Sequence, residues 1–184
     1  KYGDERKTKI AAAEGEIDVE DLIKEEQSVI TLTHFGYIKR MPVDTQKSQK
    51  RGGKGITGIA TREEDFVKQI FTASTHDIIL FFSNKGKLYR LKGYEVPEAG
   101  RTAKGTAIVN LLSLDPGEKI SAVIPINNFS EGKYLLMGTK NGLIKKTALT
   151  EYNSARKTGL LAITLKDDDE LIDVRLTDGE DNVV

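Results

Sequence analysis

The stretch ILFFSNKGKLYRL, residues 79–91, decides how the rest of the chain is expected to fold. Apolar residues run up to Phe82, a polar turn with Gly86 follows, and a second segment then carries basic residues. Glycine and asparagine tolerate positive φ, so this pattern is typical of a β-hairpin. The sequence contains the same pattern twice more, as ITLTHFGYIKRM (30–41) and LLMGTKNGLIKKT (135–147).

Two further strand-forming elements follow each hairpin. The first is a basic, glycine-bearing loop before a short strand, at 51–59, 101–109 and 156–163. The second is a strand opened by an acidic residue, at 65–71, 118–124 and 170–176. About four strands in roughly 50 residues is the period of a propeller blade. We therefore predict an all-β, propeller-like fold over residues 27–184, with blades at roughly 27–75, 76–130 and 131–184, the last of which could be incomplete.

Residues 1–26 have a different character. They are charged, with 5 basic and 9 acidic side chains, and mildly helical in pattern. We predict an acidic, partly helical connector from a preceding domain. About three blades cannot close a ring, and terminal repeats need capping. The chain is therefore expected to be a fragment of a longer protein.

Composition narrows the class of protein. The 184 residues include no cysteine, and no stretch approaches the roughly 20 apolar residues of a membrane span, so we predict a cytoplasmic protein with no membrane partner. The net charge is zero, but residues 27–166 carry +11 between acidic ends of −4 and −7. Such asymmetry indicates a polyanionic partner better than the total charge does.

The cations recur at equivalent positions of the repeat. In QKRGGKG (49–55), glycines permit positive φ and expose backbone N–H groups to an anion, while the cations reach phosphates. A periodic basic stripe suits a bent duplex held by its phosphates with little sequence specificity. The predicted DNA contacts are Gln49, Lys50, Arg51, Gly52, Gly53, Lys54, Gly55, Lys39, Arg40, Lys87, Arg90, Arg101, Lys104, Lys145, Lys146, Arg156 and Lys157.

QKRGGKG resembles the heptapeptide box of the C-terminal domain of the bacterial DNA gyrase A subunit. Lys50 stands where the usual box has arginine, which keeps the charge but loses the planar guanidinium fork. The opening KYGDERKTKI, the hairpin segments GYIKR, KGKLYRL and NGLIKKT, and the R-x-x-K-G at 101–105 also look like that family. The resemblance implies a β-pinwheel, a ring or spiral of about six blades whose basic outer rim wraps DNA.

The resemblance also implies a function. Positive wrapping of duplex DNA would let ATP-dependent strand passage introduce negative supercoils, in an A2B2 assembly with the rest of the gyrase A subunit and with the B subunit. The cleavage tyrosine, ATP and Mg would lie elsewhere in that type II topoisomerase, so this chain is expected to carry no catalytic residue, cofactor or metal. The alternatives are the equivalent domain of topoisomerase IV, in which the box is degenerate, and a propeller that binds proteins instead of DNA.

The acidic run Asp167-Asp168-Asp169-Glu170 needs a separate interpretation. A single carboxylate cluster on a loop is more typical of a solvated surface than of a metal site. A second interpretation is that the run repels DNA and marks a part of the rim that DNA does not use.

Overall fold

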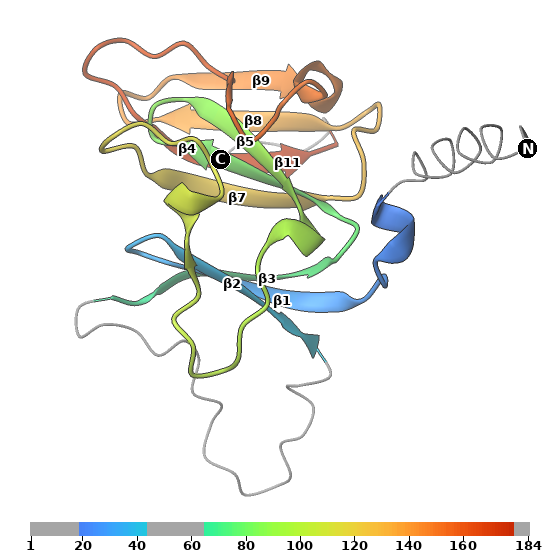
Figure 1. Cartoon of the computed structure of the whole chain (residues 1–184). Helices are drawn as coiled ribbons and strands as arrows, with labels where there is room; N and C mark the ends of the chain where they lie inside the picture. Colours follow the sequence, from blue (N-terminus) through green and yellow to red (C-terminus); the bar gives the residue numbers. More distant parts are fainter. Residues whose placement is uncertain (1–18, 44–64, 179–184) are drawn as a thin grey trace, which may run out of the picture.

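The computed structural model describes residues 19–43 and 65–178. Within these ranges the chain is all-β, with a few short 3-10 helices (Figure 1). The strands are β1 (Gln27–Thr33), β2 (Tyr37–Pro42), β3 (Val67–Ser74), β4 (Ile78–Ser83), β5 (Lys87–Lys92), β6 (Thr106–Ala107), β7 (Ile120–Ile126), β8 (Tyr134–Thr139), β9 (Ile144–Ala148), β10 (Leu160–Leu161) and β11 (Leu171–Thr177). The 3-10 helices are η1 (Val19–Leu22), η3 (Gly93–Glu95), η4 (Ile108–Asn110) and η5 (Leu149–Tyr152).

The strands form three antiparallel sheets that follow one another along the chain (Figure 1). The first has the order β3-β1-β2-β6, the second β10-β5-β4-β7, and the third β11-β8-β9. At one edge of the stack β7 and β11 lie against each other, so neighbouring sheets converge there. We call the edge with β3, β7 and β11 the inner edge, and the edge with β6, β10 and β9 the outer edge.

Each four-stranded sheet takes its outermost strand from the following repeat. β6 pairs with β2 through Ile38 and Thr106, and β10 pairs with β5 through Leu88 and Leu160. The sequence repeat groups each basic loop with the hairpin directly before it in the chain. In the structure the loop at 101–109 instead completes the sheet of the first hairpin, and the loop at 156–163 completes that of the second. This exchange covers an outer edge that would otherwise be unpaired.

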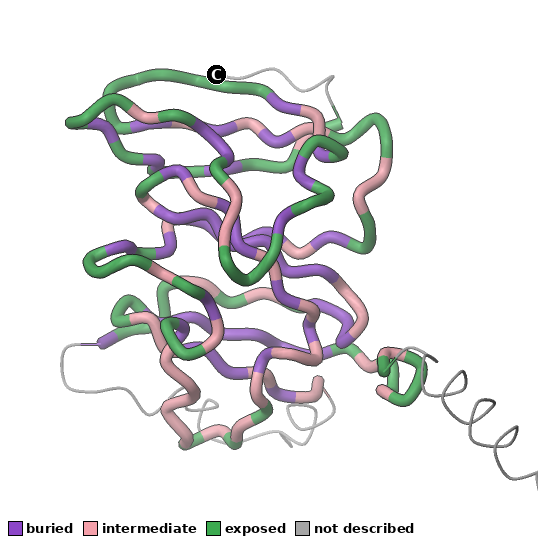
Figure 2. Tube along the Cα trace, turned by 45° about the horizontal axis from the view of Figure 1, so that its top comes forward, coloured by how far each residue is buried: buried purple, intermediate pink, exposed green. Residues whose placement is uncertain are grey.

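The second sheet lies between the other two, and β4 in it is therefore buried on both faces. All six residues of β4 are buried, and alternate ones pack on opposite sides. Leu80 and Phe82 join a cluster with residues of the third sheet, whereas Ile79 and Phe81 join a cluster with residues of the first. Figure 2 shows many buried positions in the middle of the molecule, whereas the outermost loops are largely exposed. Stacking of the sheets thus creates the hydrophobic core.

The hairpin turns use glycine in the way the sequence predicts. Gly36, Gly86 and Gly142 have φ of 88°, 80° and 89°. Within the described residues no other residue type adopts positive φ, so the neighbouring asparagines have a different role. The Asn84 side chain accepts a hydrogen bond from the backbone N–H of Lys119 at 3.0 Å, which ties the turn to the start of β7.

Buried carboxylates hold two of these turns. Asp65 Oδ1 accepts from the backbone N–H groups of Phe35 and Phe66 at 3.0 and 2.9 Å. Asp169 Oδ1 accepts from those of Asn141 and Glu170, both at 2.9 Å. Asp169 is only 7% exposed. The interpretation of 167–170 as a solvated run is therefore wrong at Asp169, whose carboxylate fixes the third hairpin.

This arrangement predicts a pH-dependent stability. Burial raises the pKa of Asp169, but the Thr139 side chain and the two backbone N–H groups outweigh burial and hold this pKa below its ordinary value. A lowered folded-state pKa contributes stability that is present above about pH 4 and is lost as the pH falls further. The stability lost in Asp169→Asn should therefore be greatest near neutral pH and shrink below about pH 4 in urea unfolding. Asp168→Asn, at an exposed neighbouring position, is the control; a pH-independent difference for Asp169→Asn would contradict this role.

Candidate nucleic-acid interface

The strand exchange brings basic residues of consecutive repeats together at the outer edge. The main chain at 97–101 runs beside β2, with Arg40 N–H donating to Pro97 O at 3.1 Å and Ala99 N–H donating to Arg40 O at 3.2 Å. The first hairpin and the loop of the second repeat thus form one surface. We call Arg40, Arg101 and Lys104 the first basic cluster.

Two members of this cluster are held by specific contacts. Arg40 Nε donates to Val96 O at 3.0 Å, and its guanidinium lies 4.0 Å from Glu26. The Lys104 ammonium lies 3.8 Å from the centroid of the Tyr37 ring. Such a cation–π contact limits where the charge can sit while leaving it partly solvent-accessible. The first cluster is therefore partly ordered by contacts within the chain.

Lys39 does not belong to this surface. Its side chain is fully buried, and Nζ donates to the carbonyl oxygens of Gly100, Arg101 and Ala103 at 2.9, 3.0 and 3.1 Å. Burial lowers the pKa of Lys39. The prediction that Lys39 contacts DNA is corrected here, because an ammonium whose three donors are used inside the fold presents none to a phosphate. The sequence pattern places this lysine on the strand but does not show which face it occupies.

A second basic cluster forms in the same way around β5 and consists of Lys87, Arg90, Arg156 and Lys157. Arg90 N–H donates to Arg156 O at 3.3 Å, so strand and loop are again adjacent. Two of the cations have acidic partners, because Lys87 Nζ lies 2.8 Å from Asp115 and Lys157 pairs with Glu95. Arg156 and Lys157 are exposed. Exposed pairs of this kind are weak and exchange readily for other anions.

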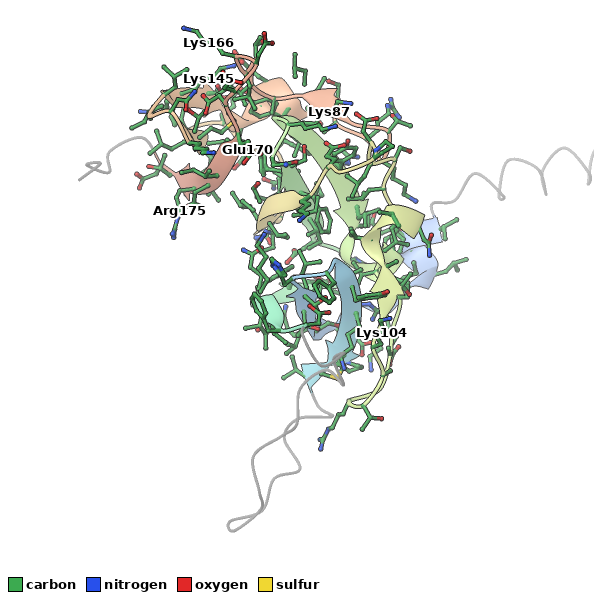
Figure 3. The ribbon with its side chains drawn as sticks, turned by 90° about the vertical axis from the view of Figure 1, so that its left-hand side faces the viewer. Lys87, Lys104, Lys145, Lys166, Glu170 and Arg175 are labelled. Carbon is green, nitrogen blue, oxygen red and sulfur yellow. The ribbon has the colours of Figure 1, made fainter. Side chains whose placement is uncertain are left out.

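Lys145 and Lys146 lie on β9, at the outer edge of the third sheet, and both are exposed. Lys145 Nζ donates to Ala162 O at 3.2 Å, and the Lys146 ammonium lies 4.6 Å from the centroid of the Tyr134 ring. Figure 3 shows Lys104 towards one end of the stack of sheets, with Lys87 and Lys145 towards the other. The predicted cations are thus distributed over all three sheets.

Sequence reasoning does not reveal the aromatic support of these cations. Besides Tyr37 and Tyr134, Phe129 lies under Arg90, with 5.5 Å from the guanidinium carbon to the ring centroid. These rings come from strands or loops distant in sequence from some of their partners, so a local pattern could not reveal them. Among the described residues, each sheet thus has a cation in contact with an aromatic ring: Lys104 beside the first, Arg90 on the second and Lys146 on the third.

The predicted contacts Gln49, Lys50, Arg51, Gly52, Gly53, Lys54 and Gly55 lie outside the described residues. Within the ranges 19–43 and 65–178, no group of three or more His, Cys, Asp or Glu side chains is arranged to hold a metal ion. In the same ranges no helix is long and apolar enough to cross a membrane.

Fold and surface together define a class of protein. It is a propeller-like repeat domain whose sheets exchange their outermost strands and carry basic residues along them. The family model described as DNA gyrase C-terminal domain, beta-propeller, matches residues 27–74, 77–127 and 133–178. These ranges make up most of the chain, which therefore belongs to this family, as its sequence resemblance predicts.

Curated relatives agree with this assignment. The chain is 61% identical over 184 residues to the DNA gyrase A subunit of Clostridium acetobutylicum. It is 55% identical over the same length to the DNA gyrase A subunit of Halalkalibacterium halodurans. Both alignments cover the whole of this chain, which spans only 22% of the length of either relative.

Solved structures confirm the predicted fold class. The crystal structure of the C-terminal domain of DNA topoisomerase IV matches with a TM-score of 0.71 and 33% identity, covering 85% of this chain and 47% of that one. The structure of a DNA gyrase A C-terminal domain matches with a TM-score of 0.65 and 28% identity, covering 83% and 48%. The chain thus shares the architecture of about half of each domain.

Proposed function

We propose that this chain binds and wraps duplex DNA as part of the C-terminal domain of a DNA gyrase A subunit. The observation that carries the proposal is the construction of basic clusters from consecutive repeats along the outer strands, in a chain that belongs to this family. Each cluster presents cations that could contact phosphates. Their recurrence from sheet to sheet suits a duplex that bends around the outer edge.

The wrap is proposed to have positive handedness, so that ATP-dependent strand passage by the complete enzyme converts it into negative supercoils. In this account the chain supplies no catalytic group. It acts within an A2B2 assembly of the two gyrase proteins, in the cytoplasm and at the nucleoid. The contacts are proposed to be made to the sugar–phosphate backbone, and they would have little sequence specificity because phosphate contacts carry no sequence information.

Topoisomerase IV is the second candidate, since a domain of that enzyme is a structural match of comparable quality. The near-intact box at 49–55 favours gyrase. Both candidates are expected to bind DNA, so binding alone does not separate them. A protein-binding propeller, in contrast, would show no salt-dependent affinity for DNA.

Salt dependence tests the contact surface directly. Removing Arg101 and Lys104 by alanine substitution should weaken duplex binding at least about tenfold near 0.1 M salt, since each lost phosphate contact restores a condensed counterion. The slope of log K against log salt should become shallower by about 1.8 for two lost contacts. Fluorescence anisotropy with a labelled duplex over a series of salt concentrations measures both quantities.

The matched control removes two lysines from the inner edge. Lys68 lies on β3, and Lys119 directly precedes β7; both residues are exposed, and Lys68 Nζ also donates to Ile120 O at 2.7 Å. Lys68→Ala combined with Lys119→Ala makes the same change in net charge and should change the slope by less than about 0.5. Equal effects of the two double variants would mean that DNA responds to total charge, and the outer-edge surface would be rejected.

A further inference from the structure

One position of the hairpin repeat contacts the basic loop of the following repeat. Lys39 pairs with Thr31 across the first hairpin, Tyr89 with Phe81 across the second, and Lys145 with Met137 across the third. Each of these three residues lies three positions after the turn glycine. Lys39 and Tyr89 are fully buried, although neither side chain is apolar throughout. Burial of a polar side chain at a repeated position requires partners for it.

The next repeat packs on this position in both cases. The Lys39 ammonium donates to three carbonyl oxygens in the segment 100–103. A Cβ on Gly105, which has φ +93°, would lie 3.1 Å from Lys39 Cβ and 2.5 Å from Ile38 O. A Cβ on Gly159, which has φ +96°, would lie 2.8 Å from the Tyr89 ring. The same glycine of successive loops therefore packs on the same position of successive hairpins.

Lys39 adds a specific constraint that Tyr89 does not. An ammonium group has three N–H donors, and each of the three carbonyls lies within hydrogen-bond distance of it. Three acceptors converging from one loop fix the direction of the peptide groups on either side of Arg101. The adjacent Lys104 is held over Tyr37, the residue two positions before Lys39. The loop is thus held at residues 100–103 by hydrogen bonds from Lys39, and at Gly105 by close packing against Ile38 and Lys39.

We propose that Lys39 is a positioning residue for DNA binding: it fixes the loop at 100–105, and through it the direction in which Arg101 and Lys104 are presented. This role rests on the proposed function, because it requires that Arg101 and Lys104 contact DNA. Lys39 itself does not touch the duplex. Without its ammonium, the carbonyl oxygens of Gly100, Arg101 and Ala103 lose their common donor, and the loop loses three hydrogen bonds that tie it to β2.

A double-mutant cycle separates this role from direct contact and from general damage. Lys39→Met keeps most of the apolar stem and removes the donors. In the otherwise unchanged chain it should weaken duplex binding by nearly as much as Arg101→Ala plus Lys104→Ala, that is, about tenfold near 0.1 M salt. Added to that double variant, it should weaken binding by less than about twofold, because the cations it positions are already gone.

Amide hydrogen exchange gives a second readout that needs no DNA. Ala103 N–H donates to Gly100 O, and Ala99 N–H donates to Arg40 O, each at 3.2 Å. Both amides should exchange faster in Lys39→Met, while amides of the third sheet keep their rates. If Lys39→Met does not fold, Gly105→Ala takes its place in the double-mutant cycle. The added Cβ would clash with Ile38 O and displace the C-terminal end of the same loop, so the expected result is the same.

The outcomes are distinct. A full tenfold loss for Lys39→Met in both backgrounds would overturn the inference and make Lys39 a contact or a global stabiliser. Unchanged exchange at Ala99 and Ala103 would overturn it as well, because the loop would not depend on Lys39. If Arg101→Ala plus Lys104→Ala bound DNA like the parent chain, the proposed contact surface would fail first, whereas faster exchange would still show that Lys39 holds the loop.

Discussion

Alanine in place of Gly86 is expected to lower the free energy of unfolding by about 3 to 5 kcal/mol, the sum of backbone strain and overpacking at a buried turn. Gly86 has φ +80°, a conformation that L side chains rarely adopt. A Cβ there would lie 2.5 Å from Ile163 O and 3.0 Å from Ile163 Cγ2. The Gly86 carbonyl also accepts hydrogen bonds from the N–H groups of Ala162 and Ile163. The second hairpin turn is therefore a docking point for the third repeat.

Gly142 provides a matched control, because it occupies the same position of the third hairpin. Its φ is +89°, but a Cβ there would meet nothing within 4 Å. Gly142→Ala should therefore cost only the strain, about 1 to 2 kcal/mol. Urea unfolding of both variants measures the difference. Equal losses would mean that the turns matter only for their backbone conformation, and that contact with the next repeat adds nothing.

The hairpins could be predicted from the sequence because their information is local. The glycines at 36, 86 and 142 and the apolar segments before them specify turn and strand without knowledge of the rest of the fold. The exchanged strands β6 and β10 could not be assigned to their sheets in this way. Each of these strands pairs through only two residues. Such a short segment has the same sequence pattern whether it pairs with its own hairpin or with the hairpin of the preceding repeat. Their sheets are known only from the folded chain, in which β6 lies beside β2 and β10 lies beside β5.

The site could be predicted in outline for a similar reason. Exposed cations such as Arg156 and Lys157 follow from composition and position in the repeat. The prediction that groups Lys39 with them is wrong, because its burial depends on carbonyl groups more than 60 residues away in the chain. The role of Asp169 escapes the sequence pattern because one of its donors comes from a turn 28 residues earlier. In each case a long-range hydrogen bond determines the role of a charged residue.

The second large effect concerns the path of DNA. If DNA follows the outer edge as proposed, we expect it to meet three cation groups, one for each sheet: Arg101 and Lys104, Arg156 and Lys157, and Lys145 and Lys146. Removing one cation group should weaken binding, but removing the central one should also interrupt the path. We therefore expect Arg156→Ala plus Lys157→Ala to reduce wrapping almost completely while duplex affinity falls only about tenfold.

Wrapping should fall more than affinity because a bent duplex needs contacts at several clusters, whereas simple binding needs contacts at only one. Bending a duplex costs on the order of 1 to 6 kcal/mol per 20–30 base pairs, which only contacts on both sides of the bend can offset. Contacts at a single cluster stabilise a straight duplex equally well. The variant Lys68→Ala plus Lys119→Ala again serves as the control, since its cations belong to the inner edge.

Plasmid topology tests the central claim of chiral wrapping most directly. Nicked circular plasmid is incubated with the chain, sealed with ligase, stripped of protein and resolved on a gel. We predict a positive shift in linking number that grows with protein concentration. The shift should persist in Lys68→Ala plus Lys119→Ala, and it should vanish in Arg156→Ala plus Lys157→Ala and in Arg51→Ala plus Lys54→Ala. Salt-sensitive binding with no shift, or a shift that survives loss of the outer-edge cations, would contradict the account.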